Sequence, residues 1–286
     1  MTVPDPVLRD LAVSFYAAPE GCSLEHFCSL LAVRGIGGIG LTSRAMQGRT
    51  PEQVSSLLGA HDLVGTSLNS AGYFLHADES RARAQREHDA RLLEWASVLK
   101  VPLNVIPGGV DDARAAGHQV TLSEARRRAQ TALEELAARA TALDVRLSLE
   151  PIHPLGLPDK GCVNQLSAAR AAIADLPGVG LTLDLFHSWW DADLAGTISS
   201  SVDELLVVQL CGVDTGLPGD PPRRTDMALG SVDVCELLDQ LDAAGRTAPV
   251  EFEVMQFQQA QEVTGLLDRA VRDWIQVRGG MVTSSR

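Results

Sequence analysis

VRLSLEP at residues 145–151 and VGLTLDL at residues 179–185 are two short apolar runs, each interrupted near its end by an acid. Apolar runs of four to eight residues bounded by turn formers are typical of buried strands. Between them, residues 165–174 have helical spacing, and Pro177 with Gly178 ends that segment. The two runs therefore predict a β–α–β unit with parallel strands.

The same alternation continues along the whole chain of 286 residues. Strands are expected at 11–15, 37–41, 64–69, 101–107, 145–150, 179–184, 205–210 and 249–254. Helices are expected at 23–32, from Thr50 onward (with Pro51 at the first helical position and Gln53 completing a capping box), and at 79–100, 121–143, 165–174, 193–200, 233–244 and 260–277.

Right-handed βαβ units of this number close most simply into a barrel. The sequence therefore predicts an α/β protein, a single (β/α)8 TIM barrel over residues 1–286, with 278–286 as a frayed tail. A doubly wound open sheet is the alternative. The sequence has no Gly-x-Gly-x-x-Gly after its first strand, which weakens that alternative.

Composition and charge exclude several classes of function. The formal net charge is −13, so phosphate neutralisation by a basic surface, and with it nucleic-acid binding, is not expected. No apolar run approaches the length of a membrane span, and the N-terminus lacks the pattern of a secretory signal. Five scattered cysteines without a Cys-x-x-Cys pair indicate reduced thiols. We therefore expect a cytoplasmic protein.

Four successive expected strands each end near a side chain that carries oxygen: Glu150, Asp184, Gln209 and Glu253. In a barrel of this kind, the C-terminal strand ends form one rim. Carboxylates that lie close together do not all ionise without a cation. The set therefore predicts one divalent metal ion, Mn²⁺ first, with Mg²⁺ or Co²⁺ as alternatives and Zn²⁺ less favoured. For any single acid, a helix cap or a surface ion pair is the competing interpretation.

Three further side chains are candidates for substrate binding. His187 lies three residues after Asp184, where it can donate to a substrate oxygen; packing within a loop is the alternative. His153 lies three residues after Glu150, and for it substrate binding and packing within a loop are equally supported. Arg224 lies in the expected loop after the seventh strand, where it can hold a substrate hydroxyl, carboxylate or phosphate.

These residues resemble the sugar phosphate isomerase/epimerase family, the xylose isomerase-like barrels. The matching motifs are LEPIHP at 149–154, LDLFHSWWD at 183–191, GSVD at 230–233 and VEFE at 250–253, with IPGG at 106–109. The resemblance implies that Glu150, Asp184, the position of Gln209 and Glu253 hold one divalent metal, and that His187 and Arg224 bind substrate. Gln209 departs from the family's usual His, although the dehydroshikimate dehydratases of the superfamily look similar in using Gln there.

A metal-assisted proton transfer uses these parts. Glu150 and Glu253 would act as the acid–base pair on the carbon next to a carbonyl, through a metal-bound enediolate. The first hypothesis is an isomerase or epimerase of a sugar, inosose or related hydroxy-ketone. The second is a lyase or dehydratase, and the third is a barrel without metal or catalysis, which only Gln209 supports. The partner is a small polyol or hydroxy-ketone, and the resemblance suggests a homo-oligomer.

Overall fold

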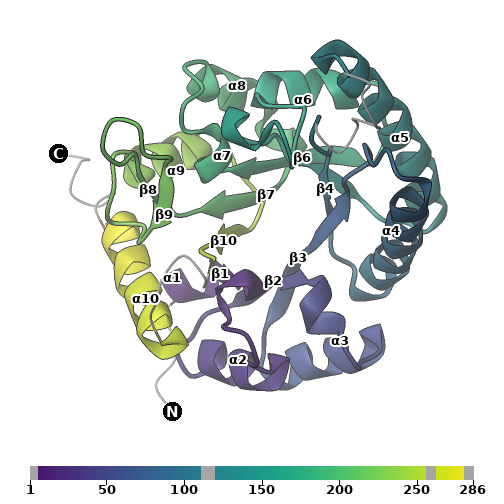
Figure 1. The fold of residues 1–286 in the computed structure, drawn as a ribbon. Coiled ribbons are helices and arrows are strands. Elements are labelled where there is room, and N and C mark those ends of the chain that lie inside the picture. The colour runs from purple at the N-terminus through teal and green to yellow at the C-terminus, as the bar shows by residue number, and fades with distance from the viewer. Residues whose placement is uncertain (1–5, 111–119, 256–261, 280–286) are drawn as a thin grey trace.

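The computed structural model describes residues 6–110, 120–255 and 262–279. Its strands form a closed parallel barrel in the order β1-β10-β7-β6-β5-β4-β3-β2, with helices around the outside (Figure 1). The strands are β1 (Leu11–Ser14), β2 (Gly38–Thr42), β3 (Val64–Gly72), β4 (Leu103–Ile106), β5 (Leu147–Leu149), β6 (Val179–Asp184), β7 (Leu205–Leu210) and β10 (Val250–Phe252). Because β1 pairs with both β10 and β2, the (β/α)8 barrel is confirmed and the open sheet is wrong.

The helices follow the expected order. They are α1 (Pro6–Arg9), α2 (Leu24–Ala32), α3 (Pro51–Ala60), α4 (Glu79–Leu99), α5 (Leu122–Ala142), α6 (Leu166–Ile173), α7 (Leu185–Ser188), α8 (Leu194–Ser201), α9 (Val234–Ala243) and α10 (Val263–Gly279). The capping box of α3 is present: the Gln53 N–H donates to Thr50 Oγ1 at 3.4 Å, and the Thr50 N–H donates to Gln53 Oε1 at 2.8 Å. Local capping chemistry therefore sets where this helix begins.

Three features differ from the sequence prediction. The short helices α1 and α7 were not expected. Part of the expected loop after β7 is a two-stranded antiparallel hairpin of β8 (Gly212–Asp214) and β9 (Arg223–Thr225). Helix α10 continues to Gly279, past the expected start of the tail, whereas residues 260–261 and 280–286 lie outside the described residues. Elements of three or four residues are too short for a periodic pattern to reveal them.

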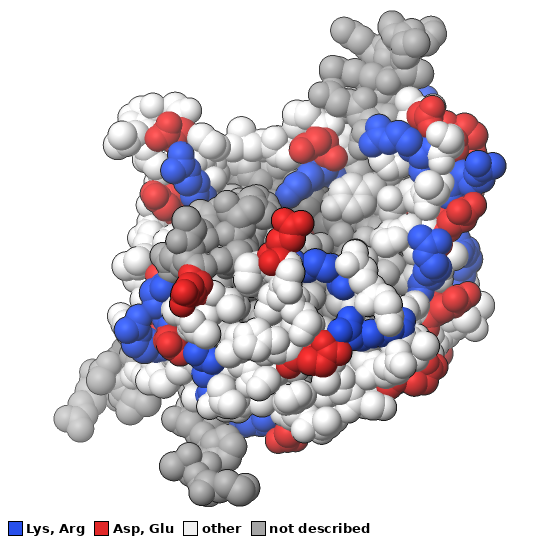
Figure 2. Space-filling view, turned by 60° about the horizontal axis from the view of Figure 1, so that its bottom comes forward, with Lys and Arg blue, Asp and Glu red and all other residues white. Residues whose placement is uncertain are grey.

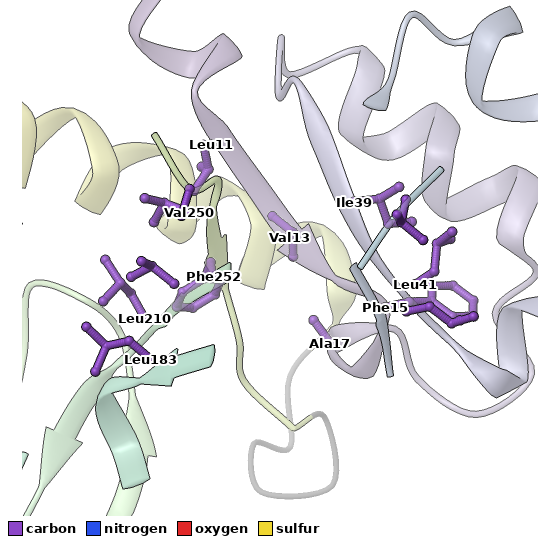
Figure 3. Close-up of a cluster of buried hydrophobic side chains, with 14 of the residues drawn as sticks. Leu11, Val13, Phe15, Ala17, Ile39, Leu41, Leu183, Leu210, Val250 and Phe252 are labelled. Atoms are coloured by element: carbon purple, nitrogen blue, oxygen red, sulfur yellow. The ribbon is translucent and has the colours of Figure 1, made fainter. Parts of the chain in front are cut away.

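Apolar side chains of the barrel strands pack outward against the helices. Successive side chains on a strand point to opposite faces. Figure 3 shows buried residues of the three neighbouring strands β6, β7 and β10 gathered together: Leu183, Leu210, Val250 and Phe252. Burial of each such side chain contributes about 1.5–3 kcal/mol. This layer holds the strand ends at fixed relative positions.

The alternate residues of the same strands point into the barrel, and several of them are polar. Thr182 Oγ1 donates to Asn104 Oδ1 at 3.0 Å and lies 2.6 Å from Ser148 Oγ. Asn104 Nδ2 in turn donates to Asn69 Oδ1 at 2.8 Å. All four side chains are buried. The interior is therefore a connected polar network, which satisfies groups that would otherwise be costly to bury.

The surface carries both signs of charge. On the face shown in Figure 2, Lys and Arg side chains are interspersed with Asp and Glu side chains. Among the helices of the described segments, none is both long enough and apolar enough to cross a membrane.

Candidate metal and substrate site

Three acids meet where strands β5, β6 and β10 end. Glu150 directly follows β5, Asp184 is the last residue of β6, and Glu253 directly follows β10. Each is at most 5% exposed. Glu150 and Glu253 line a cavity of about 290 Å³ together with His187 and Arg224. A larger groove of about 980 Å³ lies between α6 and α8 on the outside of the barrel and includes Val179, at the start of β6. Catalytic groups of such barrels gather at the C-terminal strand ends instead.

Arg224 is the positive partner of these acids. It lies on β9, it is 5% exposed, and its Nη2 forms an ion pair with Asp184 Oδ2 and another with Glu253 Oε2 at 3.1 Å. Its Nη1 also donates to the Glu253 carbonyl oxygen at 3.2 Å, and the guanidinium lies 4.6 Å from the centre of the Phe186 ring. The hairpin therefore directs Arg224 toward the buried acids. The sequence indicated a loop here and did not predict this hairpin.

The pKa values show how the three acids respond to burial and to the one arginine beside them. Burial alone would raise the pKa of Asp184, but the adjacent Arg224 guanidinium lowers it below its ordinary value. Burial and the charge of Asp184 raise the pKa of Glu150 to about 8. Burial also raises the pKa of Glu253 well above its ordinary value, against the opposing effect of Arg224. The site therefore lacks positive charge, and a divalent cation is the kind of group that would supply it.

Gln209 lies on β7, which stands between β6, the strand that ends at Asp184, and β10, the strand that Glu253 follows. Its Nε2 donates to Glu253 Oε1 at 3.1 Å and to Glu251 Oε2 at 3.2 Å. Its Oε1 is buried and has no hydrogen-bond partner within the described segments. A buried acceptor of this kind is rare, and an amide oxygen is a ligand that hard divalent cations accept. The donor set therefore fits such a cation.

His187 approaches the acids, but its hydrogen bonding makes it a donor. Its Nε2 lies 3.7 Å from Glu150 Oε1 and 3.8 Å from Asp184 Oδ2. Its Nδ1 accepts from the His153 backbone N–H at 3.2 Å, so in the neutral ring the proton is on Nε2. Burial lowers the pKa of His187 to about 3, which keeps the ring neutral. A neutral imidazole that carries its proton on Nε2 donates to a substrate oxygen there and does not ligate a metal through that atom.

The side chain of His153 is placed differently from the other candidates. Its ring stacks on Trp189 with centroids 6.0 Å apart and meets Trp190 edge-on at 5.9 Å. Its Nδ1 accepts from the Leu155 backbone N–H at 3.1 Å. The structure therefore brings ligand atoms of Glu150, Asp184 and His187 within 4.8 Å of one another. Arg224 links Asp184 to Glu253, and Gln209 contacts Glu253. His153 contributes its backbone N–H, and its ring does not line the cavity.

Sequence reasoning missed several polar residues of the site. Asn104 donates through Nδ2 to Glu150 Oε2, and Lys160, Tyr16 and Tyr73 line the cavity. Glu251 is fully buried beneath Glu253. Two signals could have found some of them: Asn104 is a polar residue in the middle of an apolar strand, and the two tyrosines are the only ones in the chain.

Asp89 supports the cavity wall from helix α4. Its Oδ1 accepts from the Gly72 N–H at 3.1 Å and from Gln85 Nε2 at 2.8 Å, and Gly72 directly precedes Tyr73. Burial raises the pKa of Asp89 to about 6. Between about pH 4 and pH 6 the folded protein therefore keeps a proton that the unfolded chain has lost, so this group's contribution to stability falls as pH rises through that window.

We expect Asp89→Asn to remove this part of the pH dependence of stability. The amide does not titrate, and its oxygen still accepts both hydrogen bonds. The free energy of unfolding of the variant, minus that of the parent, should rise by on the order of 2 kcal/mol between pH 4 and pH 7. Urea unfolding at several pH values measures it. A difference that is independent of pH would show that Asp89 is not the titrating group.

Comparison with known proteins shows which family and which solved structures this chain matches. The family model of the xylose isomerase-like TIM barrel matches residues 29–270. No curated protein matches the sequence significantly. The solved protein SMc04130 of Sinorhizobium meliloti 1021 has a TM-score of 0.84 at 23% identity, covering 94% of this chain and 98% of that one.

Two further solved structures have the same fold. The IolI protein with a bound zinc atom has a TM-score of 0.76 at 16% identity, covering 93% of this chain and 97% of that one. The 3-keto-D-glucoside 4-epimerase YcjR of E. coli has a TM-score of 0.70 at 18% identity, covering 94% and 99%. At these identities the likeness establishes the fold. Together with the family model, it shows that this chain belongs to the xylose isomerase-like TIM barrel family.

Proposed function

We propose that this protein is a divalent-metal-dependent isomerase or epimerase of a sugar, an inosose or a related hydroxy-ketone. The observation that carries the proposal is the presence of three buried carboxylates at one rim, where Glu150 and Asp184 lie close together and a single guanidinium links Asp184 to Glu253. The cavity of about 290 Å³ is at the small end of ligand sites, which suits one small polyol.

The proposed metal ligands are Glu150, Asp184, Glu253 and the unpartnered Oε1 of Gln209. Such an ion would polarise a carbonyl oxygen and stabilise the negative charge that develops there. An all-oxygen set favours Mn²⁺, with Mg²⁺ and Co²⁺ next. The zinc atom in the IolI structure supports a divalent ion at this rim and keeps Zn²⁺ among the candidates.

The proton is moved by the two glutamates in this proposal. Glu150 follows β5 and Glu253 follows β10, and β6 and β7 lie between these strands in the barrel. Two carboxylates placed apart in this way can approach one carbon from different sides, so that one removes a proton and the other returns it. Return to the same carbon inverts it, and return to the adjacent carbon isomerises an aldose and a ketose.

The remaining residues position the substrate. His187 presents Nε2–H to a substrate oxygen, and its tautomer is held by the His153 backbone N–H. Arg224 offers its guanidinium to substrate oxygens at the cavity wall while it balances Asp184 and Glu253. The epimerase activity named for YcjR, which has the same fold, supports proton-transfer chemistry on a sugar-like substrate.

Proton exchange in D₂O tests the proposal. We expect the Mn²⁺-loaded protein to incorporate one deuterium at the carbon next to the carbonyl of at least one member of a panel of ketoses, inososes and keto-glycosides, measured by NMR and mass spectrometry. Loss of water with new ultraviolet absorbance would instead indicate a dehydratase. No exchange, no elimination and no bound metal would leave the non-catalytic barrel as the answer.

A further inference from the structure

A further buried acid, Glu251, lies one layer beneath the proposed metal ligands. Glu251 is two residues before Glu253 on β10, so both side chains point into the barrel. Glu251 is 0% exposed. A buried carboxylate is costly unless its oxygens are hydrogen-bonded, and the partners of Glu251 therefore indicate what it does.

Both oxygens of Glu251 accept hydrogen bonds. Thr66 Oγ1 donates to Oε1 at 2.6 Å, and Gln209 Nε2 donates to Oε2 at 3.2 Å. Strand β2, which lies on the other side of β1 from β10, makes room for the carboxylate with Gly40, where a Cβ atom would lie 2.5 Å from Glu251 Oε2. The place of this carboxylate is therefore set by residues on β2, β3 and β7.

The contact with Gln209 decides the orientation of its amide. The two ends of a carboxamide have opposite hydrogen-bonding character, and only the NH₂ end can donate to a carboxylate. Glu251 and Glu253 both accept from Nε2, so the oxygen is kept away from them and has no partner within the described segments. A neutral amide binds a hard cation through its oxygen.

We propose that Glu251 is a positioning residue that holds the Gln209 carboxamide so that Oε1 is available to the divalent cation. This inference rests on the proposed metal site. It also gives a physical reason why Gln works where the resemblance expects His: the acid on the adjacent strand distinguishes the two ends of the amide. Residues that orient a metal ligand typically alter affinity by about 10–100-fold when they are replaced.

The variant Glu251→Gln tests the idea. Its amide can donate as well as accept, so the Gln209 amide can reverse and turn its oxygen toward residue 251. We expect the Mn²⁺ dissociation constant, measured by isothermal titration calorimetry, to rise by about tenfold or more. Gln209→Ala should weaken binding as well, and the double variant should bind no more weakly than Gln209→Ala alone, because Glu251 acts through Gln209.

A matched control separates positioning from general effects of the substitution. Glu204→Gln makes the same Glu-to-Gln change on the outside of the barrel, where Glu204 pairs with Arg170, and we expect it to leave the Mn²⁺ dissociation constant unchanged. Melting temperatures of the metal-free proteins record stability separately. If Glu251→Gln does not fold, Glu251→Asp is the second variant. It keeps the charge but moves it away from Gln209 Nε2, so it should also raise the Mn²⁺ dissociation constant, by a smaller factor.

The outcomes are distinguishable. A dissociation constant that changes by less than about threefold in Glu251→Gln, or losses that multiply in the double variant, would overturn the positioning role. A parent protein that binds no Mn²⁺, Mg²⁺, Co²⁺ or Zn²⁺ would overturn the proposed metal site itself, and this inference with it.

Discussion

Glu253→Gln is expected to lower turnover by about 10²–10⁴-fold, because the amide keeps the shape of the side chain but cannot accept a proton. The substitution also removes one charged oxygen from the proposed ligand set, so bound metal should be lost or weakened. Deuterium incorporation into the substrate that the parent protein accepts measures turnover, and the loss should persist at saturating substrate.

Glu94→Gln is the matched control for this prediction. Glu94 is exposed on α4, so the same chemical change there should leave both turnover and metal content unchanged. If Glu253→Gln kept parental turnover and metal content, Glu253 would be neither an acid–base residue nor a ligand, and the proposed mechanism would be wrong.

Arg224→Met should have the largest effect on stability. Asp184 and Glu253 would then be buried without their cationic partner, and breaking a buried ion pair in this way costs about 3–5 kcal/mol. Urea unfolding of the metal-free protein measures the loss. Added Mn²⁺ should restore part of it, because a ligand that binds the folded state stabilises it by mass action.

The comparison variant is Arg170→Met. Arg170 pairs with Glu204 at 3.1 Å, and both side chains are more than a third exposed, so the loss should be below about 1 kcal/mol. Equal effects of the two substitutions, or no recovery of Arg224→Met with Mn²⁺, would show that Arg224 does not balance charge in a cation site.

The sequence predicted what depends on local pattern. The alternation of apolar runs and helical segments gave the barrel, and the capping box at Thr50 and Gln53 gave the start of α3. The strand ends gave the positions of Glu150, Asp184 and Glu253, because parallel strands of a closed barrel end at one rim. Their role as metal ligands stays a prediction.

What the sequence could not predict depends on register between distant segments. Thr66 and Glu251 are 185 positions apart, and their contact follows from the closure of the barrel, in which β3 pairs with β2, β2 with β1, and β1 with β10. The β8–β9 hairpin, which turns Arg224 toward Asp184, has strands of three residues and no periodic signal. The orientation of the Gln209 amide likewise depends on an acid from another strand.

The metal content of the protein, purified without chelator or a histidine tag and measured by inductively coupled plasma mass spectrometry, tests the proposed site most simply. We expect about one divalent ion per chain, Mn²⁺ first among the candidates, either as purified or after incubation with Mn²⁺ and removal of the excess. A protein that holds no divalent ion under either condition would contradict the proposed chemistry at Glu150, Asp184 and Glu253.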